Sequence, residues 1–134
     1  MTEVDDALGA FTAELKHQGL WNDTVVMVVS EFGRTLSSNA QGTDHAWGGN
    51  YFMLGGEVKG GQVLGHYPDR LGYYDSELNL GRGIYVPTTP WESVWNAVCP
   101  WWGIDDPGQI SDILPNKVNF PSSDLFTRAD LFEE

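Results

Sequence analysis

The pattern of apolar positions at the start of the chain predicts a helix followed by a buried strand. Apolar side chains recur at steps of four, three and four, which places them on one face of a helix over residues 2–17. Residues 24–30 are apolar and β-branched on both faces, as is typical of a strand covered on both sides. A helix, a short loop and a buried strand are half of a βαβ unit, so we predict the α/β class. The helical positions are Val4, Leu8, Phe11 and Leu15.

The middle of the chain predicts loops with little regular structure. Eleven of the sixteen glycines lie between residues 42 and 83. Within this stretch, only residues 51–54 have the pattern of another buried strand, and residues 83–86 form a short extended run. Glycine-rich backbone bends sharply or approaches another group closely, so we expect a loop-rich region here.

A second apolar helix is predicted after this region. Thr89 is a candidate N-cap, Pro90 the first helical residue and Glu92 the partner in a capping box, and Gly103 ends the helix. The helical spacing of its tryptophans favours core packing over ligand stacking, whereas Trp101 falls off the apolar face and is expected to be exposed. That face contains Trp91, Val94, Trp95, Val98 and Trp102.

The rest of the chain adds shorter elements. Cys99, on the second apolar helix, is expected to be a buried core thiol. A shorter helix is predicted to start at Asp106–Pro107 and run toward Leu114. Beyond it the tail is irregular, with one turn near residues 127–132.

Composition narrows the possible functions. A chain of 134 residues is one domain or part of a larger one. Its formal net charge of -12 repels phosphate backbones, so we predict no nucleic-acid partner. The longest aliphatic run, residues 25–29, is far shorter than the roughly 20 residues that span a bilayer, so no membrane insertion is expected. The acidic N-terminus lacks the layout of a signal peptide, and the compartment stays open.

Two segments carry candidate chemistry. Residues 30–35 follow the predicted strand, and ligands of open α/β sheets bind at such strand ends. There Glu31 can ligate a metal, and Arg34 presents a planar fork for phosphate, sulfate or carboxylate. Asp44 and His45, in a predicted glycine-rich loop, offer oxygen and nitrogen ligands to a divalent cation. The alternatives are a simple turn at Asp44–His45 and a Glu31–Arg34 ion pair.

These two segments resemble a known family. Ser30-Glu31-Phe32-Gly33-Arg34-Thr35, Gly42-Thr43-Asp44-His45 and the glycines that follow are similar to domain-of-unknown-function family 1501, which belongs with the sulfatase-like and alkaline-phosphatase-like proteins. The resemblance covers most of residues 2–103. Residues 104–134 add little to it and are interpreted as a C-terminal extension.

The resemblance implies part of an alkaline-phosphatase-like α/β sandwich, whose buried central sheet carries a two-metal site for hydrolysing phosphate or sulfate esters. It implies Glu31, Asp44 and His45 as ligands of zinc, manganese, iron or calcium, with Arg34 as the catalytic residue that stabilises the oxyanion. Glu31-Phe32 stands where the superfamily usually has Asp-His or Asp-Asn. The nucleophile and the remaining ligands would lie upstream. The hypothesis is therefore the C-terminal portion of a larger domain, inactive as this isolated chain.

A second hypothesis is a non-catalytic binding or assembly module. In it, the glycine-rich segment and exposed tryptophans form a surface for a protein or polysaccharide. A half-domain would also leave a sheet edge uncovered, which predicts an upstream chain segment or a homo-oligomer as the partner.

Overall fold

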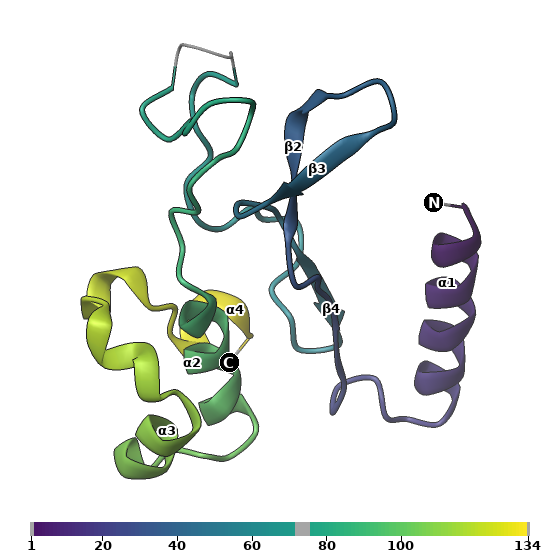
Figure 1. Cartoon of the computed structure of the whole chain (residues 1–134). Coiled ribbons are helices and arrows are strands. Elements are labelled where there is room, and N and C mark those ends of the chain that lie inside the picture. The colour runs from purple at the N-terminus through teal and green to yellow at the C-terminus, as the bar shows by residue number, and fades with distance from the viewer. Residues whose placement is uncertain (1, 72–75, 134) are drawn as a thin grey trace.

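The structure is a computed structural model that describes residues 2–71 and 76–133 (Figure 1). It confirms the mixed α/β class, with small antiparallel sheets and four α-helices among the described residues. The elements in chain order are α1 (Thr2–His17), β1 (Val25–Val28), β2 (Gly33–Ser38), β3 (Thr43–Ala46), β4 (Phe52–Gly55), α2 (Trp91–Trp101), α3 (Pro107–Ile113) and α4 (Arg128–Leu131). Two 3-10 helices, Pro115–Asn119 and Ser122–Asp124, lie between α3 and α4.

Strands β1 and β4 form a two-stranded antiparallel sheet, with Val25 opposite Gly55 and Val28 opposite Phe52. Successive side chains of a strand point to opposite faces. Met27 and Met53 accordingly pack against the core made by α2 and α4. Phe52 and Leu54 face α1 across a groove of about 360 Å³. Figure 1 shows α1 on one side of this sheet and α2 and α4 on the other.

The predicted first strand is corrected in two ways. It is shorter than residues 24–30, and its four residues are half-buried because α1 stands away from the sheet. Its partner β4 runs antiparallel, so the expected parallel βαβ unit is not formed by the described residues. The predicted helix over residues 2–17 is confirmed, but none of its residues is buried.

The β2–β3 hairpin, which forms the second sheet, was not predicted. Arg34 lies opposite His45 and Ser38 opposite Thr43, with an irregularity in register between these pairs. Thr35 is its one buried residue, at 3% exposure, so the hairpin lacks the apolar alternation that marks a strand. Asp44 and His45 therefore lie on a strand rather than in the predicted loop.

The core is formed by α2 and the C-terminal residues. Ala97 and Val98 of α2 pack with Leu131 and Phe132, and a second cluster joins Cys99, Ile110 and Leu114. Cys99 is thus a buried thiol, as predicted.

The exposure predicted for Trp101 is wrong. Its ring stacks on Phe132 with centroids 5.1 Å apart and an interplanar angle of 12°. Its indole N–H also donates a hydrogen bond of 2.9 Å to Glu57. Trp102 is the exposed residue of this pair, at 74%. Pro100 lies inside α2, and the helix ends one residue later.

The ends of the helices explain where the chain turns. Pro90, with extended backbone, occupies the N-cap position of α2, and no side chain caps it, so the predicted Thr89 cap and its capping box are wrong. Gly103 follows α2 with a φ of 88°, which favours glycine and ends the helix as predicted. Asp106 caps α3 by accepting a hydrogen bond of 2.9 Å from the Gln109 N–H, and Thr127 opens α4 with a capping box.

The C-terminal residues are hydrogen-bonded to the segment that follows β4. The Lys59 N–H donates to the Leu131 carbonyl at 2.9 Å, and the Glu133 N–H donates to the Glu57 carbonyl at 2.8 Å. The Lys59 ammonium also donates to the Ala129 carbonyl at 2.6 Å. The tail therefore completes the core. No described helix is long and apolar enough to cross a membrane.

Candidate functional site

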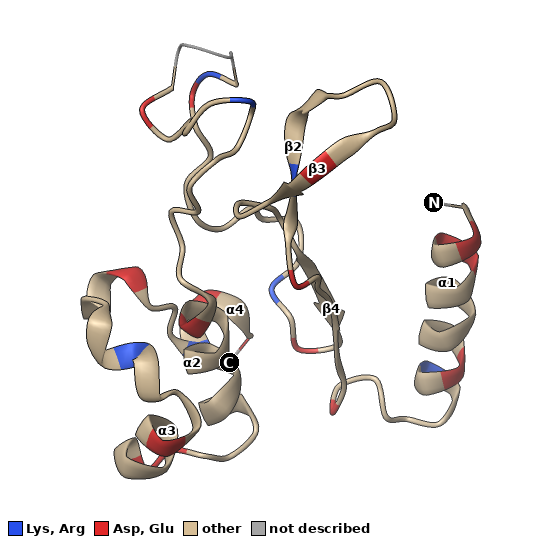
Figure 2. Ribbon diagram, viewed as in Figure 1, with Lys and Arg blue, Asp and Glu red and all other residues tan. Residues whose placement is uncertain are grey.

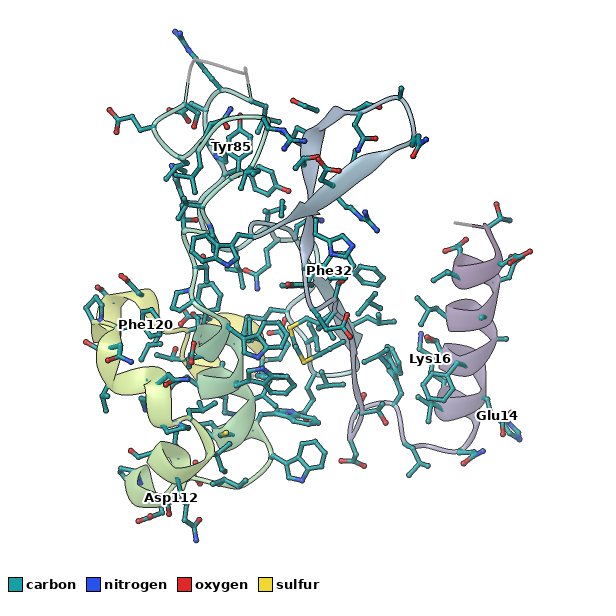
Figure 3. All side chains as sticks on the ribbon, viewed as in Figure 1. Glu14, Lys16, Phe32, Tyr85, Asp112 and Phe120 are labelled. Carbon is teal, nitrogen blue, oxygen red and sulfur yellow. The ribbon has the colours of Figure 1, made fainter. Side chains whose placement is uncertain are left out.

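Arg34 and His45 lie side by side because they are opposite each other in the hairpin. The His45 ring stacks on Phe32, labelled in Figure 3, with centroids 3.8 Å apart and an interplanar angle of 14°. The Arg34 guanidinium lies 5.1 Å from the Phe32 ring centroid and donates to the Thr43 carbonyl at 2.8 Å. The alternative Glu31–Arg34 ion pair is not formed in the structure. Phe32 thus contacts both the Arg34 and the His45 side chains on one side of the hairpin.

Asp44 links the β2–β3 hairpin to Arg82, which lies 38 residues further along the chain. One carboxylate oxygen accepts a hydrogen bond of 2.7 Å from the Asn39 amide, and the other pairs with Arg82. The Asp44 N–H donates to the buried Thr35 hydroxyl at 3.1 Å. Both oxygens therefore already have protein partners.

The three predicted ligands do not fit one metal ion in this arrangement. Asp44 and His45 are neighbours on β3, and neighbouring strand residues point to opposite faces. Glu31 is exposed in the link between β1 and β2. Over residues 2–71 and 76–133, no group of three or more His, Cys, Asp and Glu side chains could hold a metal. The metal set stays a prediction, and no hydrolytic step is derived from it.

An open groove of about 1590 Å³ lies between the β1–β4 sheet, residues 58–68 and the start of α2. Its lining is mostly apolar and includes the exposed side chains of Trp47, Val63 and Trp91. Glu31 and Arg34 lie in the same lining, so the groove brings these two predicted site residues together. Asp44 and His45 are not part of it.

An aromatic cluster forms one wall of this groove. The Tyr51 ring meets Trp91 edge-on with centroids 5.3 Å apart, and Trp91 meets Trp95 in the same manner at 5.8 Å. The Tyr51 hydroxyl donates to the Ser30 carbonyl at 3.0 Å, which fixes the ring at the end of β1. Sequence reasoning treated these tryptophans as core residues and missed that Trp91, 44% exposed, faces the groove.

Two glycines of the sequence patterns have a packing role. The Gly48 N–H donates to the Tyr85 carbonyl at 2.9 Å, and a Cβ at Gly48 would lie 2.7 Å from that oxygen. A Cβ at Gly33 would collide with the Gly48 carbonyl. Both positions require glycine because three backbone segments meet there. Backbone packing therefore explains why glycine occurs at both positions of the sequence patterns, and no ligand is needed for that explanation.

Charged residues occur in many of the elements and connecting segments (Figure 2). Asp and Glu occur on α1, on α3 and in the connecting segments, whereas β1 and β4 contain no charged residue. The short sheet is thus an uncharged region within a strongly acidic chain.

These features define a mixed α/β protein with an open apolar groove beside a short antiparallel sheet. The chain belongs to the family described as protein of unknown function (DUF1501), whose model matches residues 1–80. This confirms the family that the sequence patterns resemble. No curated protein and no solved structure matches the chain. The matched region contains α1, both sheets and much of the groove lining, and it ends before α2.

Proposed function

We propose that this chain is a polypeptide-binding module, and that its groove receives a hydrophobic segment of a partner protein. The observation that carries the proposal is the size and lining of the groove. Pockets for small ligands have volumes of roughly 300–1,000 Å³, so a groove of about 1590 Å³ suits a longer occupant. Trp47 at 69% exposure and Val63 at 83% would lose contact with water when that occupant binds.

The composition of the groove also favours a protein partner. Aromatic side chains and arginine are the residues that most often dominate protein–protein binding energy, and Trp47, Trp91 and Arg34 all line the groove. The few polar groups would serve to orient the bound segment.

The proposal is tested with an array of hydrophobic peptides, followed by calorimetric titration of the best binder. Trp47→Ala should weaken binding by about tenfold or more, because it removes an exposed aromatic contact of the groove. Trp102→Ala is the matched control, because Trp102 is similarly exposed but does not line the groove. Equal affinities of the two variants, or an array without any binder, would contradict the proposal.

Hydrolysis of phosphate or sulfate esters is a second proposal. It is supported by the shared position of Glu31 and Arg34 in the groove. In it, the chain acts only together with further polypeptide that supplies the nucleophile, and a divalent metal requires Asp44 and His45 to rearrange. The sulfatase-like and alkaline-phosphatase-like ancestry belongs to this proposal.

Elemental mass spectrometry tests this second proposal directly. The untagged chain is dialysed against zinc, manganese, iron or calcium and compared with an Asp44→Ala/His45→Ala double variant. Near-stoichiometric metal that disappears in the double variant would support the proposal and justify esterase assays. A wild-type chain without bound metal would refute a metal site formed by this chain alone.

A further inference from the structure

The chain exposes more surface than a compact protein of its mass. Its accessible area is 9380 Å². A compact monomer of 14.9 kDa is expected to expose about 7,000 Å², so the excess is about 2,400 Å². A stable protein interface covers about 800 Å² on each partner, and obligate dimers cover more. The excess is large enough for an obligate interface.

The β1–β4 sheet shows where such an interface would form. Neither strand has a second strand beside it among the described residues, so both outer edges of the sheet are open. A two-stranded sheet is only marginally stable, and three or more strands are usually needed. The edge of β1 is Val25-Val26-Met27-Val28, without the charge, proline or glycine that normally blocks further pairing. In contrast, β4 ends at Gly55, and Gly56 follows it.

We propose that two copies of this chain pair through the outer edges of their β1 strands. An antiparallel strand edge is self-complementary, so one two-fold axis would join the two sheets into four strands in the order β4–β1–β1–β4. Each copy then supplies the backbone partners that the other lacks. This pairing uses the backbone edge of β1, whereas the groove proposed above to bind a partner segment is lined by side chains, among them Met27 of the same strand.

The distribution of charge supports a second copy in this position. Neither β1 nor β4 carries a charge, so pairing them desolvates no ionised side chain on the strands. The net charge of -12 on each chain nevertheless makes the two copies repel at long range. Salt screens this repulsion, and dimerisation should therefore strengthen with ionic strength. A basic partner protein would instead bind more weakly as salt is added.

Sedimentation equilibrium over a wide concentration range tests the proposal at low and high salt. We expect the mass of two chains, with a dissociation constant that falls as salt is added. Val26→Lys places a charge on β1 and should raise the dissociation constant by about tenfold or more. Val118→Lys is the control, because Val118 is 80% exposed on the first 3-10 helix.

Hydrogen exchange gives a readout that needs no variant. The backbone amides of β1 should lose protection when the wild-type chain is diluted below its dissociation constant, while those of α2 stay protected. A chain that is monomeric at every concentration and salt would overturn the proposal. So would a dimer that Val26→Lys leaves intact or whose β1 amides do not respond to dilution. Trp47→Ala should leave dimerisation unchanged, so failure of the dimer and failure of groove binding are separate results.

Discussion

The two ends of this chain differ in how much they bury. Every buried hydrophobic residue among the described ones lies between residues 97 and 132. Helix α1 has a comparable apolar stripe, yet Val4 and Phe11 on that stripe are each 49% exposed. The family model nevertheless matches residues 1–80 and not the buried C-terminal part. The residues that define the family are therefore not those that hold this structure together.

This difference has a physical consequence for where binding takes place. Segments with little buried apolar surface open at low free-energy cost, and they leave apolar groups available to partners. The open β1 edge and most of the groove lining belong to the less buried part, whereas Trp91, Val94 and Leu131 line the groove from the other part. The α2–α4 core supplies the stability on which that part depends, through the contacts of Met27 and Met53.

The largest expected difference in the free energy of unfolding is between alanine variants of two phenylalanines, one from each end of the chain. Phe132→Ala removes a ring that is fully buried and stacked on Trp101, and should lower the free energy of unfolding by about 3–5 kcal/mol. Phe11→Ala removes a half-exposed ring of α1 and should cost less than about 1 kcal/mol. Urea denaturation of both variants measures the difference. Similar losses would show that α1 is as important for stability as the core.

An intermediate difference in the free energy of unfolding is expected between variants of two residues whose hydroxyl groups each accept a hydrogen bond from a backbone N–H. Ser93 is fully buried and accepts from the Phe126 N–H at 2.9 Å, so Ser93→Ala should cost about 1–3 kcal/mol by leaving that donor unpaired.

Thr35 accepts in the same way from the Asp44 N–H, but Asp44 is only half-buried. Because Asp44 is partly exposed, its N–H can bind water after a small shift, so Thr35→Val should cost less than about 1 kcal/mol and mainly speed exchange of the Asp44 amide. Thermal unfolding compares the variants globally, and amide exchange compares them locally. A larger global loss for Thr35→Val than for Ser93→Ala would reverse the comparison between core and hairpin.

The sequence predicted those parts of the fold in which a local pattern also decides the structure. The period of α1, the start of α3 at Asp106–Pro107 and the position of Gly103 are all local signals, and each was confirmed. The β2–β3 hairpin was missed because backbone contacts hold it and its single buried residue is polar. Trp101 was misplaced because its environment is set by Phe132, a residue thirty-one positions away.

The candidate site was less predictable for a related reason. Sequence order placed Asp44 beside His45, but strand geometry turns their side chains to opposite faces. Arg82, which pairs with the Asp44 carboxylate, is remote in sequence, and no local pattern predicted this ion pair. The groove is likewise assembled from separate stretches of the chain, since residues such as Glu31, Trp47, Val63 and Trp91 meet only in three dimensions.

The smallest expected effect lies at the edge of the core, in the cap of α4. The Asp130 carboxylate accepts hydrogen bonds of 2.7 Å from both the Thr127 N–H and the Thr127 hydroxyl. These bonds, the one to the backbone first, hold the pKa of Asp130 below its usual range, with a smaller contribution from Lys59. Because the folded-state pKa is depressed, the stabilisation is complete above the unfolded-state pKa and is lost as the pH falls through the folded-state value.

Asp130→Ala should therefore cost less than about 1 kcal/mol at neutral pH, since the cap is exposed to solvent. The difference from the wild type should begin to shrink below about pH 4, where the carboxyl group of the unfolded chain takes up a proton, and should shrink further as the pH falls through the lower folded-state pKa. Urea denaturation at pH 7 and pH 3 measures it, with Asp112→Ala on α3 as a control at an exposed aspartate outside the α4 cap. If Asp130→Ala lowers the free energy of unfolding by the same amount at both pH values, the negative charge of Asp130 contributes nothing to the stability of the C-terminal residues.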